Sequence, residues 1–244
     1  MGKNKLKLAI MQPTFNPWIG YFDLIDYVDE FVFLDTVQLA KRSWQVRNKL
    51  KVNNKEYMFS LPIKKEKSRD ETILKDVKLS FDNYDFSLKL NSLILRNYKK
   101  ARYFSELEEK IFNILSYKTE YLCEYNINFI KEISKLLNIN TNFSLSSNLK
   151  NIQGNKGDLI LNICINKSCS EYISALGSKD YLYKYLKKFN MKNIDIVYQY
   201  YKHPIYNQVG ENFIYQLGIL DLLFNEGLES SKEIMLKGRY FIDC

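Results

Sequence analysis

The sequence predicts an α/β domain with a mainly parallel sheet. Residues 6–11 and 31–34 are short apolar runs typical of buried strands, and residues 18–29 between them have apolar side chains at helical spacing. A strand, a helix and a second strand in this order form the unit from which parallel sheets are built. The 244 residues, 46% of them hydrophobic, suffice for one large folded domain.

A β-hairpin is predicted next. Residues 44–51 and 55–63 have strand character on either side of Asn53 and Asn54. Asparagine tolerates the positive φ angles that a tight hairpin turn requires. After a charged loop, residues 75–79 are expected to form a short strand.

Helical periodicity then dominates residues 84–137, with breaks near Ala101 and Thr119 that predict three helices. We expect this segment to be a helical elaboration or lid within a single domain, residues 1–244, because no low-complexity linker separates it from the rest.

The last third of the chain returns to alternating strands and helices, as a parallel sheet requires. Gly227 follows the last predicted helix and suits its C-cap. The predicted strands are 142–147, 172–175 and 194–201, and the predicted helices are 156–166, 179–188 and 213–225.

Composition narrows the class of protein. The net charge of +8 attracts anions, but the lysines are scattered, and no basic stripe or known module predicts binding to nucleic acid. The four cysteines lack the spacing of a zinc site, so no metal site is predicted and a reducing compartment is favoured. No signal peptide or apolar stretch of about 20 residues is present, which predicts a cytoplasmic protein.

The first candidate site is the loop between the first strand and the first helix. In open α/β sheets, ligands bind where such loops leave the carboxyl ends of the strands. Gly20 permits close approach of the backbone to a ligand, and the helix N-terminus favours an anion. The predicted binding residues are Gln12, Asn16, Trp18, Gly20 and Tyr21.

A second polar group follows the second strand. Asp35 ends that strand, where a carboxylate can bind a hydroxyl or amine or act as a base. The arginines of this group could clamp a phosphate or carboxylate. Besides Asp35, its members are Gln38, Arg42, Trp44, Arg47 and Asn48.

A third candidate lies between residues 172–175 and the following helix. Gly177 permits a tight turn, and Ser178 is expected to cap the helix N-terminus. Free backbone N–H groups and Lys179 would make an anion cradle there, with Tyr181 beside it. An ordinary connection between strand and helix is the alternative.

The fourth candidate contains His203, the single histidine of the chain, which leaves the strongest predicted strand. An imidazole titrates near neutral pH and suits proton transfer. Tyr206 and Gln208 follow it as predicted binding residues. Asp221 is polar within an apolar helix and, if buried, needs a partner, for which His203 or Arg47 are candidates. We expect all four groups to gather around one cleft.

Two resemblances add to these expectations. Phe15-Asn16-Pro17 followed by Trp18-Ile19-Gly20-Tyr21 is similar to the phosphate-binding loop of nucleotidylyltransferases, in which H-x-G-H follows F-D-P. Aromatic residues stand here at both histidine positions. The resemblance implies a Rossmann-like, nucleotidylyltransferase-like sheet, without the groups that stabilise a leaving pyrophosphate.

Nearly the whole chain resembles the WbqC-like family. Ala175 departs from the family, whose members often have glycine there. The stretches that carry the resemblance are Q-P-T-F-N-P-W-I-G-Y-F-D-L-I-D (12–26), F-V-F-L-D-T-V-Q (31–38), W-Q-V-R-N (44–48), N-Y-K-K-A-R-Y-F (97–104), Y-I-S-A-L-G-S-K-D-Y-L (172–182), H-P-I-Y-N-Q (203–208) and I-L-D-L-L-F-N-E-G (219–227).

The family resemblance implies a bacterial protein of O-antigen or capsule biosynthesis that transfers an acyl or aminoacyl group to a nucleotide-linked or lipid-linked amino sugar. His203 would deprotonate the amine, and Asp221 would orient His203. Gln12 and Asn48 would hold polar groups of the donor. The cofactor is left open. An activated acyl donor is expected, and tRNA as the donor's carrier would be the exception to the absence of nucleic acid. The alternatives are a nucleotidylyltransferase-like enzyme and a non-catalytic sugar- or nucleotide-binding partner in a polysaccharide assembly complex.

Overall fold

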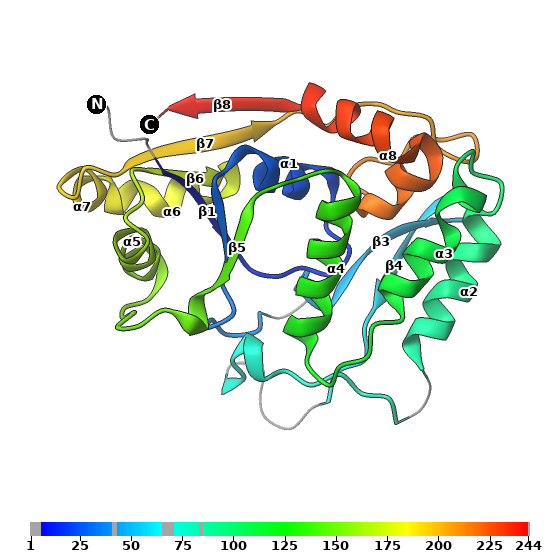
Figure 1. Cartoon of the computed structure of the whole chain (residues 1–244), viewed down its shortest axis with the longest axis horizontal. Helices are drawn as coiled ribbons and strands as arrows, with labels where there is room; N and C mark the ends of the chain where they lie inside the picture. Colours follow the sequence, from blue (N-terminus) through cyan, green and yellow to red (C-terminus); the bar gives the residue numbers. More distant parts are fainter. Residues whose placement is uncertain (1–5, 41–42, 65–70, 83–84, 244) are drawn as a thin grey trace.

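The computed structural model describes residues 6–40, 43–64, 71–82 and 85–243 and shows an α/β domain around a six-stranded sheet (Figure 1). Five strands are parallel, and the last strand is antiparallel to its neighbour. The mainly parallel sheet is therefore confirmed. In spatial order the strands are β5 (Asn142–Leu145), β2 (Glu30–Phe33), β1 (Lys7–Met11), β6 (Glu171–Ala175), β7 (Asp195–Tyr201) and β8 (Arg239–Asp243).

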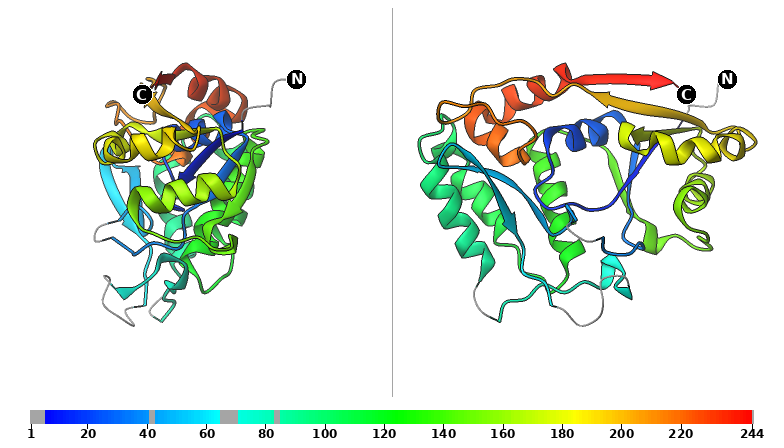
Figure 2. Two further views of the ribbon diagram at one scale, coloured as in Figure 1. Left: turned by 90° about the vertical axis from the view of Figure 1, so that its left-hand side faces the viewer. Right: turned by 180° about the vertical axis from the view of Figure 1, so that it is seen from behind.

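Helices cover both faces of the sheet, and alternate strand residues enter two separate cores. Ala9 and Phe31 face the core that contains α1 (Ile19–Tyr27), α4 (Leu122–Leu136) and α8 (Ile219–Lys237). Leu8 and Val32, their neighbours in sequence, face the core formed with α5 (Lys156–Asn166), α6 (Lys179–Leu182) and α7 (Leu186–Asn190). The right-hand view of Figure 2 shows α5–α7 on the side of the sheet opposite α4.

The predicted hairpin and the predicted helical segment are both confirmed. Strands β3 (Arg47–Val52) and β4 (Lys55–Ser60) form a separate antiparallel pair, with φ of 50° at Asn53 and 60° at Asn54. Beyond it lie α2 (Phe86–Tyr98) and α3 (Phe104–Leu115), and α4 completes the segment between the hairpin and the sheet (Figure 1).

Three predicted elements differ in the structure. Residues 75–79 form no strand, because the 3₁₀ turn Leu74–Asp76 precedes isolated bridges at Lys78 and Leu79. The helix predicted for residues 179–188 is divided into α6, the 3₁₀ turn Tyr183–Tyr185 and α7.

The last helix also differs from its predicted bounds. Helix α8 begins at Ile219, because Gln216 adopts φ of 58° and Phe213 and Tyr215 pack against His203. It continues past Gly227, whose φ of 75° produces a kink inside the helix instead of the expected C-cap. The chain then returns along the sheet edge as β8, a strand that the sequence patterns do not predict.

Within the described residues, no helix combines the length and the apolar character needed to cross a membrane. The described cysteines, Cys123, Cys164 and Cys169, are buried free thiols.

Candidate functional site

A cleft of about 280 Å³ opens beside the carboxyl end of β1. Trp18 comes from the loop after β1 and Tyr21 from α1, whereas Trp44 precedes strand β3 of the hairpin and Asn48 lies within it. All four are predicted binding residues. The lining is completed by Met11, Thr14, Pro17, Lys49 and Gln216.

Backbone and side-chain hydrogen bonds tie the two walls of this cleft together. Phe15 N donates to Trp44 O over 3.0 Å. The Asn48 side-chain amide donates to Phe15 O and Asn16 O, at 2.9 and 2.8 Å. Gln45 Nε2 donates to Gln12 Oε1 at 2.5 Å. Gln12 and Asn48 therefore join the two walls of the cleft, Gln12 through its Oε1 and Asn48 through both of its N–H groups.

Asn16 and Gly20 have structural roles that differ from those expected. Asn16 is buried with φ of 41°, and its Oδ1 accepts a hydrogen bond from Leu220 N over 3.5 Å. Asn16 therefore contacts the first turn of α8. The group that approaches Gly20 closely is the Trp18 indole, because a Cβ added at Gly20 would lie 2.5 Å from Trp18 Cη2. The Trp18 ring therefore lies against the first turn of α1.

His203 lies behind Trp18, with the two rings nearly parallel at an interplanar angle of 9° and a centroid distance of 6.0 Å. Its Nδ1 donates to Pro204 O over 2.8 Å, and its Nε2 accepts from Gln216 N over 3.2 Å. Burial lowers the pKa of His203 below its usual value, so the neutral imidazole is favoured. Both ring nitrogens are engaged by backbone groups in this arrangement.

The expected pairing of Asp221 with His203 or Arg47 is wrong. Asp221 is 0% exposed and accepts hydrogen bonds from Tyr98 Oη at 2.9 Å and Tyr206 Oη at 2.8 Å. Because α8 begins only at Ile219, its first turn directs Asp221 toward α2 and the hairpin. Burial raises the pKa of the Asp221 carboxyl to about 6. Asp221 therefore cannot orient His203.

Tyr206 and Gln208 belong to this buried group beneath the hairpin. Lys51 Nζ donates to Gln208 Oε1 over 3.4 Å, and Lys51 N donates to Tyr98 Oη over 2.9 Å. The sequence does not predict Tyr98 and Lys51 as members, since no local pattern relates them to Asp221.

Asp35 itself does not line the cleft. Its carboxylate accepts from Ser146 Oγ at 2.7 Å, from Ser147 N at 2.9 Å and from Ser147 Oγ at 2.6 Å, which joins the end of β2 to the turn after β5. Gln38 bridges Ile73, and Arg47 pairs with Ser60 at the start of the hairpin. Arg42 lies outside the described residues.

The Gly177 group also does not line the cleft, since its loop passes to the face of the sheet covered by α5–α7. The Ser178 hydroxyl lies 2.6 Å from Ser174 Oγ and donates to Ala175 O at 2.8 Å, so it does not provide the expected side-chain cap for α6. Lys179 Nζ lies 5.9 Å from the centre of the Tyr198 ring, and Tyr181 is 40% exposed. Of the four groups expected around one cleft, only two contribute to its lining, the first through Trp18 and Tyr21 and the second through Trp44 and Asn48.

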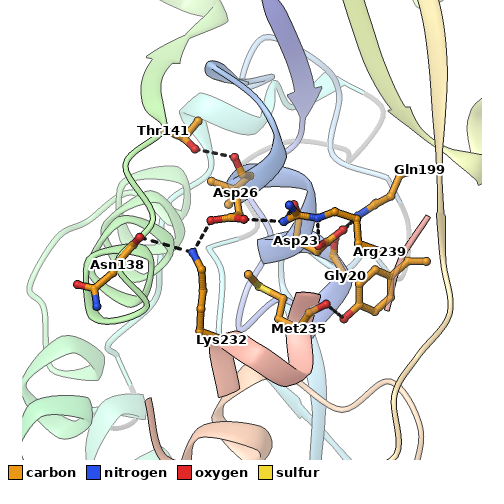
Figure 3. Close-up of polar contacts among 11 residues, drawn as sticks. Gly20, Asp23, Asp26, Asn138, Thr141, Gln199, Lys232, Met235 and Arg239 are labelled. Atoms are coloured by element: carbon orange, nitrogen blue, oxygen red, sulfur yellow. Dashed lines mark hydrogen bonds and ion pairs between the residues drawn. The ribbon is translucent and has the colours of Figure 1, made fainter. Parts of the chain in front are cut away.

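A network of ion pairs holds α1 from behind the cleft (Figure 3). Arg239 Nε donates to Asp23 Oδ1 at 2.7 Å, and Arg239 Nη2 donates to Asp26 Oδ2 at 2.6 Å. Lys232 of α8 also binds Asp26. Gln199 of β7 donates to Gly20 O and Asp23 Oδ2, so α1 is held by α8, β7 and β8 together.

Comparison with known proteins agrees with the resemblance seen in the sequence. An uncharacterized protein of Mycobacterium tuberculosis, Rv1507c, is 29% identical over 226 residues, which cover 92% of this chain and 95% of that protein. No solved structure matches the chain. The sequence profile of the WbqC-like protein family matches residues 12–233. The cleft and the elements that support it fall within that range, and the chain belongs to the WbqC-like protein family.

Proposed function

We propose that the protein is a cytoplasmic enzyme of bacterial surface-polysaccharide biosynthesis, acting on O-antigen or capsule precursors. It transfers an acyl or aminoacyl group to the amine of a nucleotide-linked amino sugar. The cleft between Trp18 and Trp44 carries this proposal. Concave sites with aromatic walls and a few polar groups bind ligands that have apolar faces, as sugar rings and nucleobases do.

The charges around the cleft suit an amine that must react as a nucleophile. No carboxylate is among the described lining residues, and the one lining cation, Lys49, pairs with Glu56 at 2.8 Å. An ammonium group placed there would lack an acidic partner, which favours its neutral form. Only a neutral amine has the lone pair that attacks an acyl carbon.

His203 is the proposed proton acceptor. Its Nε2 is held by the backbone of Gln216, and Gln216 itself lines the cleft. Movement of Gln216 on substrate binding would free that nitrogen. The amine nitrogen then bonds to the acyl carbon, and the carrier leaves with the electron pair of its former bond. His203 takes the amine proton and passes it to the carrier.

A thermal-shift screen followed by product analysis tests the proposed function. Nucleotide-linked amino sugars should raise the unfolding temperature more than the corresponding sugars without an amine. Incubation with acyl-CoA, acyl phosphate or aminoacyl-tRNA should then yield an amide, detected as the matching mass increase of the sugar nucleotide. Stabilisation by free nucleoside triphosphates with magnesium, and not by nucleotide sugars, would reject acyl transfer in favour of nucleotidyl transfer.

The second candidate function is a non-catalytic sugar- or nucleotide-binding protein of a polysaccharide assembly complex. The backbone bonds to both ring nitrogens of His203 favour it, because they give the imidazole a structural role. Replacement of His203 by Asn separates the two. If the protein is an enzyme, the variant should keep its fold and ligand affinity but lose turnover. If it is a binding protein, the variant should keep its fold, its ligand affinity and its cellular function.

A further inference from the structure

The side chain of Asn126 in α4 contacts both walls of the cleft from beneath. It is 0% exposed, and its Nδ2 donates to Pro13 O at 3.1 Å and to Gln45 O at 2.8 Å. Pro13 belongs to the loop that carries Trp18, and Gln45 directly follows Trp44. One side-chain amide therefore satisfies a carbonyl group in each wall.

The orientation of this amide follows from its partners. Turning the amide over would place its oxygen against two carbonyl oxygens, which repel it. In the observed orientation, Asn126 Oδ1 has no hydrogen-bond partner among the described residues. A buried oxygen without a donor reduces stability. The presence of an amide at this position is explained by its two N–H donors, which satisfy one carbonyl group in each wall.

We propose that Asn126 is a positioning residue of the cleft, setting the distance between the Trp18 loop and the Trp44 segment. This inference rests on the proposed function, because it takes the cleft to be the substrate site. It also gives α4 a role as the support of the site from below. Opening this helix as a lid would break both hydrogen bonds and leave two carbonyl groups unpaired.

The chain provides its own probe of this geometry. It contains two tryptophans, Trp18 and Trp44, and both line the cleft. Tryptophan emission and its quenching by acrylamide therefore report on the cleft walls without any ligand. Asn126→Leu, which keeps the branched shape of the side chain and removes both donors, should move the emission to longer wavelength and increase quenching while far-UV circular dichroism stays unchanged.

Two variants of the same helix serve as matched controls. Ser134→Ala removes a buried hydroxyl that has no hydrogen-bond partner among the described residues, and Ile133→Val lowers stability through a small cavity. Both should keep wild-type emission and quenching. If Ile133→Val changes the fluorescence as much as Asn126→Leu does, the effect is general loosening and the proposal is overturned.

Asn126→Ala covers the case in which the leucine variant fails to fold, because the smaller side chain leaves room for water beside the two carbonyl groups. Wild-type fluorescence in either folded variant overturns the positioning role. If the fluorescence changes as expected while the wild-type protein binds no nucleotide sugar, the positioning role stands and the proposed function fails. Where a nucleotide sugar binds, its affinity should fall about tenfold in the variant, or about 1.4 kcal/mol.

Discussion

Gly20 lies directly against the indole of Trp18, so closely that a Cβ atom at position 20 would stand 2.5 Å from Cη2 and 2.6 Å from Cζ2 of that ring. The ring in turn lies parallel to His203 and lines the cleft. The position of one cleft wall thus depends on the absence of a side chain at the start of α1.

Gly20→Ala should therefore displace Trp18. Overpacking of this kind costs about 1–3 kcal/mol, and urea unfolding should show the loss together with altered tryptophan emission. Gly177→Ala is the matched control, since a Cβ at Gly177 meets nothing within 4 Å. Its stability should stay within about 0.5 kcal/mol of the wild type. Equal effects of the two substitutions would contradict the Gly20–Trp18 relationship.

Trp44→Ala should weaken ligand binding without unfolding the protein. The Trp44 side chain is 48% exposed, so folding buries little of it, whereas a bound sugar or base would cover it. Loss of an aromatic anchor typically reduces affinity tenfold or more. Isothermal titration with the nucleotide sugar identified in the thermal-shift screen measures the change. Tyr183→Ala, which removes a 72% exposed ring outside the cleft, should bind normally.

The Asp221 carboxyl should make stability fall as pH rises from about 4 to about 6. Its pKa is raised from 3.8 to about 6 in the folded protein, so within this range the unfolded chain loses a proton that the folded protein keeps. The stabilisation is complete below 3.8 and is lost as pH passes through the folded pKa, a change of about 3 kcal/mol.

Urea unfolding at several pH values measures this dependence, and comparison with Asp221→Asn isolates it from the other carboxyls. The asparagine cannot titrate, so the variant should lose that part of the pH dependence. A variant whose stability follows pH as steeply as the wild type would show that Asp221 is already ionised in the folded protein at low pH.

Arg239→Met should strongly destabilise the edge of the sheet. Asp23 is fully buried, and Arg239 is the cation bound to it (Figure 3). Leaving one partner of a buried pair costs about 3–5 kcal/mol. The exposed pair of Lys135 with Glu132 offers the contrast, since Lys135→Met should cost less than about 1 kcal/mol. Chemical denaturation compares them, and hydrogen exchange in β8 should increase only in the Arg239 variant.

The features that can be predicted from the sequence are local ones. Apolar runs identify β1 and β2, and the pair Asn53-Asn54 identifies the hairpin turn, because in each case neighbouring residues carry the whole signal. Trp18 and Trp44 are predicted in the same way, as members of the segments that follow the first and the second predicted strand. Strand β8 escapes prediction, since its five residues directly follow a helix and its pairing depends on β7.

The partners of buried polar side chains depend on contacts between distant segments. Tyr98 and Asp221 are 123 residues apart, and Asn126 and Pro13 are 113 residues apart, so no periodicity in the chain relates them. From the sequence alone, a carboxylate such as Asp221 or Asp35 has the same pattern whether it is a catalytic group or a structural anchor. Only the residues that pack around it in the folded protein distinguish these two roles.

The sequence by itself therefore determined the fold class, the family, and the loop after β1 as a wall of the site, because strand and helix patterns and motif residues are properties of consecutive positions. The tertiary structure decided that Trp18 and Trp44 line one candidate cleft, that Asp221 bonds to the buried Tyr98 and Tyr206, and that Asn126 of α4 bonds to the chain beside both tryptophans. Those assignments depend on which carbonyls, hydroxyls and rings meet once water is excluded, and residues far apart in the chain meet only when it folds.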